Sequence, residues 1–289
     1  MMYRKYMQML ILSQSVKNCF MILQSLLNKI TSVTLSKRKE FVLITVVLTG
    51  GLVAAQLIAE STRYWTLLFL TVSTYAISAL GLREQMKGIK WVTLLALPTL
   101  FTAAVGLFYF LLPVRWLTRL PVATLYAVGI YAILLVENIY SVAVNRSIQL
   151  LRVAHAVGFL VTLVTIFLLL NTLYSLRLES YINIGLVALI TMPLVLQSLW
   201  SIKLDETIDR TVLIYSIFVA LLLSEVGYMI SFWPLKPIII SIFLTTISYA
   251  LIGICQHYFA KRLFKQNIIE YVQVVAIVTV LILITTRYR

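Results

Sequence analysis

Nine stretches of about 20 apolar residues follow one another along this chain of 289 residues, and they constrain its fold more than any other feature. An α-helix needs about 20 residues to cross the hydrocarbon core of a bilayer. The apolar residues run almost continuously, whereas the strands of a membrane barrel would alternate. The sequence therefore predicts an all-α, polytopic transmembrane helical bundle of about nine spans, with a range of eight to ten. The predicted spans are 41–60, 65–82, 91–112, 121–144, 150–174, 182–202, 211–233, 238–258 and 267–286.

The composition excludes several other classes of protein. Hydrophobic residues make up 61% of the chain and charged residues 12%, whereas about 25% of the residues of a soluble domain are charged. A disordered chain, a disulfide scaffold and a soluble enzyme are therefore excluded. A net charge of +14 would indicate nucleic-acid binding in a soluble protein. Here the basic residues gather in the connections between spans, so membrane lipids are the predicted partners and no nucleic acid is predicted.

The distribution of Lys and Arg predicts the orientation of the chain. Cytoplasmic connections of membrane proteins are enriched in these two residues. With the N-terminus placed in the cytoplasm, seventeen of them fall on the inner side and seven on the outer side. We therefore expect a multi-pass protein of the cell membrane with a cytoplasmic N-terminus and a C-terminus outside.

Residues 1–40 differ from the rest of the chain because Lys and Arg are interspersed among Met, Leu and Ile. Such a basic amphiphilic segment is predicted to lie on the inner membrane surface, where anionic lipids attract it. Residues 41–289 then form the transmembrane domain, and the first span acts as its own insertion signal. A tenth span over residues 6–27 is the alternative, although Lys17 near its centre would be costly in hydrocarbon.

The most concentrated polar group inside the spans lies where the fourth span ends and the fifth begins. It consists of Glu137, Asn138, Arg146, Gln149, Arg152 and His155. At about 1.5 Å per residue from the short turn, Glu137 lies about 12 Å deep and Arg152 about 9 Å deep. We expect these two to form an ion pair across the hairpin, with Asn138 and Gln149 hydrogen-bonded between helices. The alternative is a pocket open to the cytoplasm, in which Arg146 and Arg152 hold a phosphate or carboxylate and Glu137 accepts a proton.

Glu225 is the other lone acid within a span, and it has no basic neighbour in sequence. One interpretation is a neutral carboxyl hydrogen-bonded to a backbone group or a tyrosine, and the other is a proton-carrying site. Glu137 and Glu225 could belong to one translocation path if their helices are adjacent. Gly50, Gly51 and Pro98 could break helices at membrane depth, as happens in transporters.

No recognised enzyme motif occurs in the chain, which lacks GxSG, GxxxxGK, an Asp within a span and a zinc-type HExxH. No catalytic residue, cofactor or metal is therefore predicted. The first hypothesis is a non-enzymatic structural or accessory membrane protein whose intramembrane charges fix helix pairing. The second is a small-molecule or proton-coupled transporter. The third is a lipid-processing enzyme with Arg146, Arg152 and His155 at the inner headgroup level.

Several short runs within the fourth and fifth spans carry a resemblance to other sequences. They are Glu137-Asn138-Ile139, Arg146, Ile148-Gln149-Leu150-Leu151-Arg152, Ala154-His155-Ala156 and Gly158-Phe159. On these residues the chain resembles uncharacterised polytopic membrane proteins of candidate-phyla bacteria. The resemblance implies a bacterial cytoplasmic-membrane protein, and it brings no activity, ligand or site residue.

Overall fold

The apolar stretches form long helices in the computed structural model. The structure describes residues 37–55, 63–83, 88–112, 116–142, 148–205 and 207–287, and these ranges contain nine helices and no strand. Within the part of the chain that it describes, the all-α fold is therefore confirmed. The helices are α2 (Lys37–Ala55), α3 (Arg63–Leu82), α4 (Lys90–Leu111), α5 (Trp116–Ser141), α6 (Ile148–Ser175), α7 (Ser180–Lys203), α8 (Arg210–Ser231), α9 (Pro237–Phe259) and α10 (Lys265–Arg287).

Eight of these helices, α3 to α10, are long and apolar enough to cross a membrane by length and composition. The sequence analysis allowed eight to ten spans, so the polytopic bundle is confirmed. The helix α2 covers most of the first predicted span, but it begins at Lys37, so its first turn carries the charges of Lys37 to Glu40. The remainder of the predicted membrane-surface segment, residues 1–36, lies outside the described residues.

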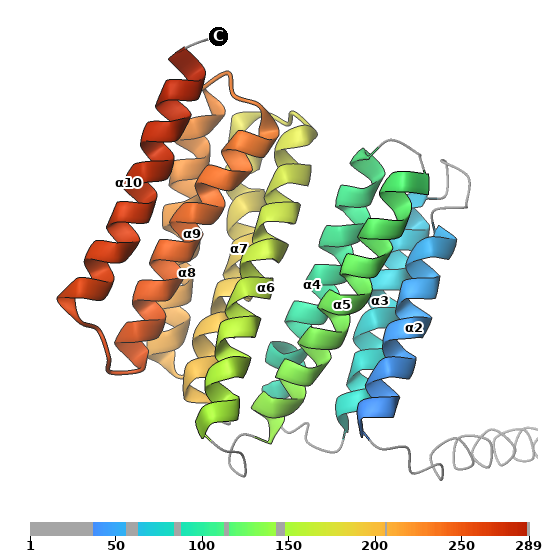
Figure 1. The fold of residues 1–289 in the computed structure, drawn as a ribbon. Coiled ribbons are helices and arrows are strands. Elements are labelled where there is room, and N and C mark those ends of the chain that lie inside the picture. The colour runs from blue at the N-terminus through green and yellow to red at the C-terminus, as the bar shows by residue number, and fades with distance from the viewer. Residues whose placement is uncertain are drawn as a thin grey trace, which may run out of the picture. The chain divides into compact units, whose positions relative to one another are not determined.

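The helices of the bundle lie side by side, and each runs opposite to the one before it (Figure 1). In the N-terminal helix group, α2 to α5, the helix α4 packs on both α3 and α5. In the C-terminal helix group, α6 to α10, α7 packs on α8, and α9 packs on α6 and α10. The two groups meet where α4 and α5 pack on α6, and where α4 packs on α7.

Gly50, Gly51 and Pro98, which could have broken helices at membrane depth, lie within continuous helices. The helix α2 continues through Gly50 and Gly51, and α4 continues through Pro98. The missing N–H of Pro98 leaves the Leu94 carbonyl oxygen without its helical donor, and the hydroxyl of the next residue bonds to a different carbonyl of this turn. The Thr99 hydroxyl donates to the Leu95 carbonyl oxygen at 2.7 Å. One of the arguments for a transporter is therefore lost.

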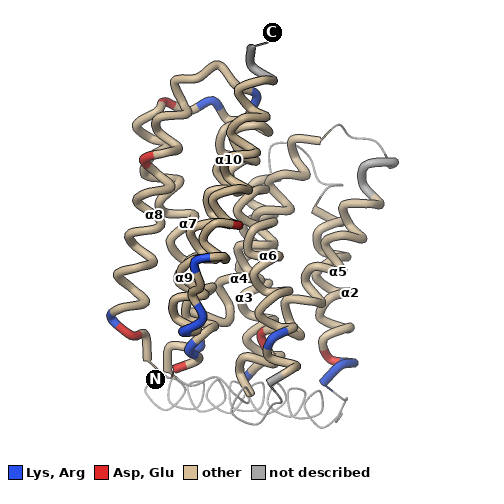
Figure 2. Tube along the Cα trace, turned by 60° about the vertical axis from the view of Figure 1, so that its left-hand side comes forward, with Lys and Arg blue, Asp and Glu red and all other residues tan. Residues whose placement is uncertain are grey.

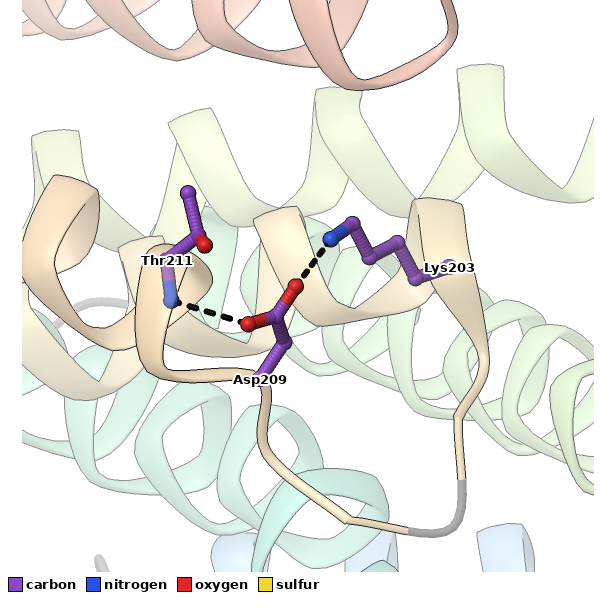
Figure 3. A network of polar contacts seen from close by, with 3 residues as sticks. All are labelled: Lys203, Asp209 and Thr211. Carbon is purple, nitrogen blue, oxygen red and sulfur yellow. Dashed lines mark hydrogen bonds and ion pairs between the residues drawn. The ribbon is translucent and has the colours of Figure 1, made fainter.

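The connection between α7 and α8 is held by polar contacts (Figure 3). The Asp209 carboxylate caps α8 by accepting a hydrogen bond from the Thr211 backbone N–H at 3.0 Å, and it forms an ion pair with Lys203. The hydrogen bond from Lys203, supported by that from Thr211, lowers the pKa of Asp209. Leu204 ends α7 in the left-handed conformation, with φ of 55°.

Candidate functional site

A buried polar pair lies at the junction between the two helix groups. Glu137 on α5 is 0% exposed, and one of its oxygens, Oε1, accepts a hydrogen bond from Gln197 Nε2 on α7. Among the residues that the structure describes, the other carboxyl oxygen of Glu137, Oε2, has no hydrogen-bond partner, and neither has Gln197 Oε1. Both of these buried oxygens can only accept hydrogen bonds as long as the carboxyl is ionised.

The position of Glu137 follows from the helical period of α5. The buried side chains Tyr126, Ile130, Ile133 and Leu134 recur at intervals of three or four residues, and Glu137 continues this stripe. Residues at this spacing share one face of an α-helix. The helical periodicity that buries the apolar side chains of α5 therefore also places the carboxyl group of Glu137 in the core.

A second set of contacts ties α6 to its neighbours beside this pair. The Tyr140 hydroxyl on α5 donates to the Ala154 carbonyl oxygen at 3.1 Å. His155 Nε2–H donates to the Ser201 carbonyl oxygen at 2.8 Å, and that carbonyl lies in the last turn of α7, where helix carbonyls lack a partner within their own helix. The rings of Tyr140 and His155 are 5.4 Å apart. A Cβ atom on Gly158 would lie 2.7 Å from the Tyr140 hydroxyl, so only glycine allows this close approach.

The same segment of α7 also contacts α9. Gln256 Nε2 donates to Ser198 Oγ at 2.8 Å and to the Ser198 carbonyl oxygen at 3.3 Å. Trp200 is almost fully buried, and its Nε1–H donates to the Asp205 carbonyl oxygen at 3.0 Å. Residues 197–201 of α7 therefore connect α5, α6 and α9. We call these contacts the α7 network, formed by Glu137, Tyr140, His155, Gln197, Ser198, Ser201 and Gln256.

The expected ion pair between Glu137 and Arg152 is not formed. Arg152 is exposed, whereas Glu137 is enclosed and bonded to Gln197. At 3.6 residues per turn, Arg152 lies on the opposite side of α6 from Ala154, whose side chain faces the bundle core. The rotation of α6 therefore directs Arg152 away from the core that encloses Glu137.

The structure separates the remaining predicted cluster residues. His155 is half-buried and belongs to the α7 network, and Asn138 is half-buried beside Glu137 on α5. Gln149 is exposed near the start of α6. Arg146 lies outside the described residues. The structure thus brings Glu137 and His155 into one network and leaves Gln149 and Arg152 outside it.

Glu225 is exposed on the surface of α8. Its neighbours on this face include the exposed apolar side chains of Phe218, Leu221 and Met229. The main packing partners of α8 are α7 and α9, whereas Glu137 lies enclosed on α5. The two acids therefore do not face each other, and the condition for a shared translocation path is not met.

The sequence analysis missed Gln197, Ser198, Ser201 and Gln256. It searched the spans mainly for charges, and these residues are uncharged. Two glutamines in otherwise apolar spans were a usable signal, because side-chain amides within membranes hydrogen-bond across helices. The partner of each amide could not have been inferred, since it depends on which helices are neighbours.

Two apolar cavities lie away from the α7 network. One of about 190 Å³ lies between α3, α4, α6 and α7, where Phe110 and Leu173 are among its lining residues. The other, of about 260 Å³, lies between α8, α9 and α10, where Trp233 and Phe243 line it. The described residues contain no group of three or more His, Cys, Asp or Glu side chains that could hold a metal ion.

These features define a multi-pass helical membrane protein in which α7 joins the N-terminal helix group through the buried hydrogen bond between Glu137 and Gln197, and bonds to α6 and α9 within its own group. The model of a protein family of unknown function, DUF5656, matches residues 73–285. The chain therefore belongs to the DUF5656 family, and the match includes every residue of the α7 network. No curated protein matches the chain, and no solved structure matches it either.

Proposed function

We propose that this protein is a non-enzymatic structural or accessory protein of a bacterial cytoplasmic membrane. The observation that carries the proposal is the contact between Glu137 and Gln197, which is fully enclosed at the junction of the two helix groups. A residue that binds a soluble substrate needs access to water, whereas a residue that fixes helix packing does not. Glu137 and Gln197 are both buried, so they fit a role in fixing helix packing.

The energetic role of the pair follows from its burial. A hydrogen bond between membrane helices contributes about 0.6 kcal/mol on average, and up to about 2 kcal/mol. A buried polar group that loses its partner costs about 1–3 kcal/mol. The pair therefore stabilises one arrangement of α5 against α7 mainly by making other arrangements unfavourable.

The alternative functions have less support. A lipid-processing site would use Arg152 and His155 together, but Arg152 is exposed and His155 Nε2 is bonded to a backbone carbonyl. A proton-coupled transporter would use Glu137 and Glu225, and these two acids do not face each other.

The proposed orientation places the N-terminus in the cytoplasm and the C-terminus outside. Most described Lys and Arg residues lie at one end of the bundle, and this end includes the starts of α6, α8 and α10 (Figure 2). Cytoplasmic ends of membrane helices are enriched in these residues. With this orientation, the basic segment of residues 1–40 would lie against anionic lipids of the inner leaflet.

The test compares two variants that each replace an acid within a span by an apolar residue. Glu137→Leu leaves Gln197 without its partner, so we expect the free energy of unfolding in detergent to fall by about 2 kcal/mol. Glu225→Leu is the matched control, and it should not lower stability because Glu225 is exposed. Proteoliposomes of the unaltered protein should not dissipate a pH gradient. Equal stability of Glu137→Leu and the unaltered protein, or proton flux that depends on Glu137, would refute the proposal.

A further inference from the structure

The two unpartnered oxygens of the buried pair point to a proton. We propose that Glu137 and Gln197 form a proton-binding site in which Glu137 is the neutral acid and its Oε2–H donates to Gln197 Oε1. The inference rests on the proposed structural function, because it specifies how the contact between α5 and α7 is completed. It assigns the site one ligand, a single proton.

The count of donors and acceptors carries the inference. An ionised carboxylate can only accept hydrogen bonds, whereas a protonated carboxyl also has one O–H donor. Gln197 Nε2 already donates to Glu137 Oε1, so Glu137 Oε2 and Gln197 Oε1 are left as two buried acceptors. One proton on Oε2 turns one of these acceptors into a donor for the other. The carboxyl and the carboxamide are then joined by two hydrogen bonds in a closed ring, and each of the two oxygens named above has a partner.

The described residues around the pair supply no positive charge that would replace the proton. Lys90, at the start of α4, donates to the Ser141 carbonyl oxygen, and Lys203, at the end of α7, pairs with Asp209. On α6, Arg152 is exposed. Among the described residues, Glu137 therefore has no basic partner. A buried carboxylate without such a partner is strongly disfavoured, because no nearby charge compensates for the loss of its hydration.

The other titratable side chains near the pair are already engaged. The Tyr140 hydroxyl donates to the Ala154 carbonyl oxygen, and the Nε2–H of His155 donates to the Ser201 carbonyl oxygen. Neither of these donors is left for Glu137 Oε2. The proton of the carboxyl itself is therefore the donor that completes the pair.

The experiment compares the full-length protein with Glu137→Gln by infrared spectroscopy and by thermal unfolding. The new carboxamide has its own N–H donor for Gln197 Oε1, so the ring closes without a proton and the variant should fold. We expect the unaltered protein at neutral pH to show the C=O band of a protonated carboxyl, and Glu137→Gln to lose it. Glu225→Gln is the control and should retain this band. From neutral to alkaline pH, the melting temperature should fall further in the unaltered protein than in Glu137→Gln.

Sodium is the competing ligand, because two acceptor oxygens can also hold a cation. Replacing choline chloride by sodium chloride at constant ionic strength should leave the melting temperature of the unaltered protein unchanged. A sodium-dependent rise that Glu137→Gln abolishes would overturn the inference, as would a carboxyl band that Glu137→Gln does not reduce. If Glu137→Leu destabilises the protein but the unaltered protein lacks the carboxyl band, only the proposed proton-binding site is refuted and the structural function stands. If Glu137→Leu leaves stability unchanged, the structural function itself fails.

Discussion

The close packing of α6 on Tyr140 predicts opposite outcomes for the same substitution at two glycines. In Gly158→Ala, the new methyl group would lie 2.7 Å from the Tyr140 hydroxyl and 3.3 Å from a methyl group of Val136. In Gly185→Ala on α7, no heavy atom apart from the adjacent residues and the backbone of its own helix lies within 4 Å of the new methyl group. Alanine is favoured over glycine within a helix by about 1 kcal/mol. Only at Gly158 does a steric cost oppose this gain.

The expected magnitude follows from these contacts. Tyr140 is buried and its hydroxyl is bonded to the Ala154 carbonyl oxygen, so it cannot move away freely. Overpacking a buried site costs about 1–3 kcal/mol, and displacing the hydroxyl weakens a hydrogen bond worth about 1 kcal/mol. After the gain in helix propensity, Gly158→Ala should lower the free energy of unfolding by about 1–3 kcal/mol. Gly185→Ala should raise it by up to about 1 kcal/mol.

Reversible unfolding of both variants in mixed micelles, followed by tryptophan fluorescence, measures this difference. Gly185→Ala reports the intrinsic effect of the substitution in a helix of the same protein. The reasoning would be refuted if the two variants changed stability by the same amount, because α6 would then not approach Tyr140 as closely as the structure shows. Combining Gly158→Ala with Tyr140→Phe should restore part of the loss, since the hydroxyl that meets the new methyl group is removed.

Two further predictions concern Asp209 and Thr99. The hydrogen bond from Lys203 is the main cause that lowers the pKa of Asp209 in the folded protein. The ionised Asp209 carboxylate therefore stabilises the fold fully above the pKa that Asp209 has in the unfolded chain, and this stabilisation is lost as the pH falls through the lowered pKa of the folded protein. Asp209→Asn retains the cap on Thr211 but loses the ion pair with Lys203. The free energy of unfolding of this variant, measured at decreasing pH, should therefore depend less on pH than that of the unaltered protein. The same pH dependence in both proteins would contradict this prediction. Thr99→Val removes the donor to the Leu95 carbonyl oxygen, and it should lower the free energy of unfolding by about 1 kcal/mol. A stability equal to that of the unaltered protein would show that this hydrogen bond does not stabilise the fold.

The buried site could be predicted only in part. Glu137 was identified because an acid in an apolar span is costly and needs a partner. Its partner was expected to be Arg152, which is close in sequence and similar in depth, whereas the structure gives Gln197, which is 60 residues away in sequence. Sequence distance and depth do not determine the direction in which a side chain leaves its helix. That direction follows from the rotation of α6, which carries Ala154 toward the core and Arg152 away from it.

The sequence by itself determined that this chain forms a bundle of transmembrane helices. Long apolar stretches have one stable form in a bilayer, because a helix satisfies its backbone hydrogen bonds within a single segment. The sequence also marked Glu137 as a residue that needs a partner. Only the tertiary structure decided that this partner is Gln197 and that α7 connects α5, α6 and α9. The physical reason is that hydropathy depends on each segment alone, whereas an interhelical hydrogen bond depends on which helices are neighbours and which faces they turn toward one another.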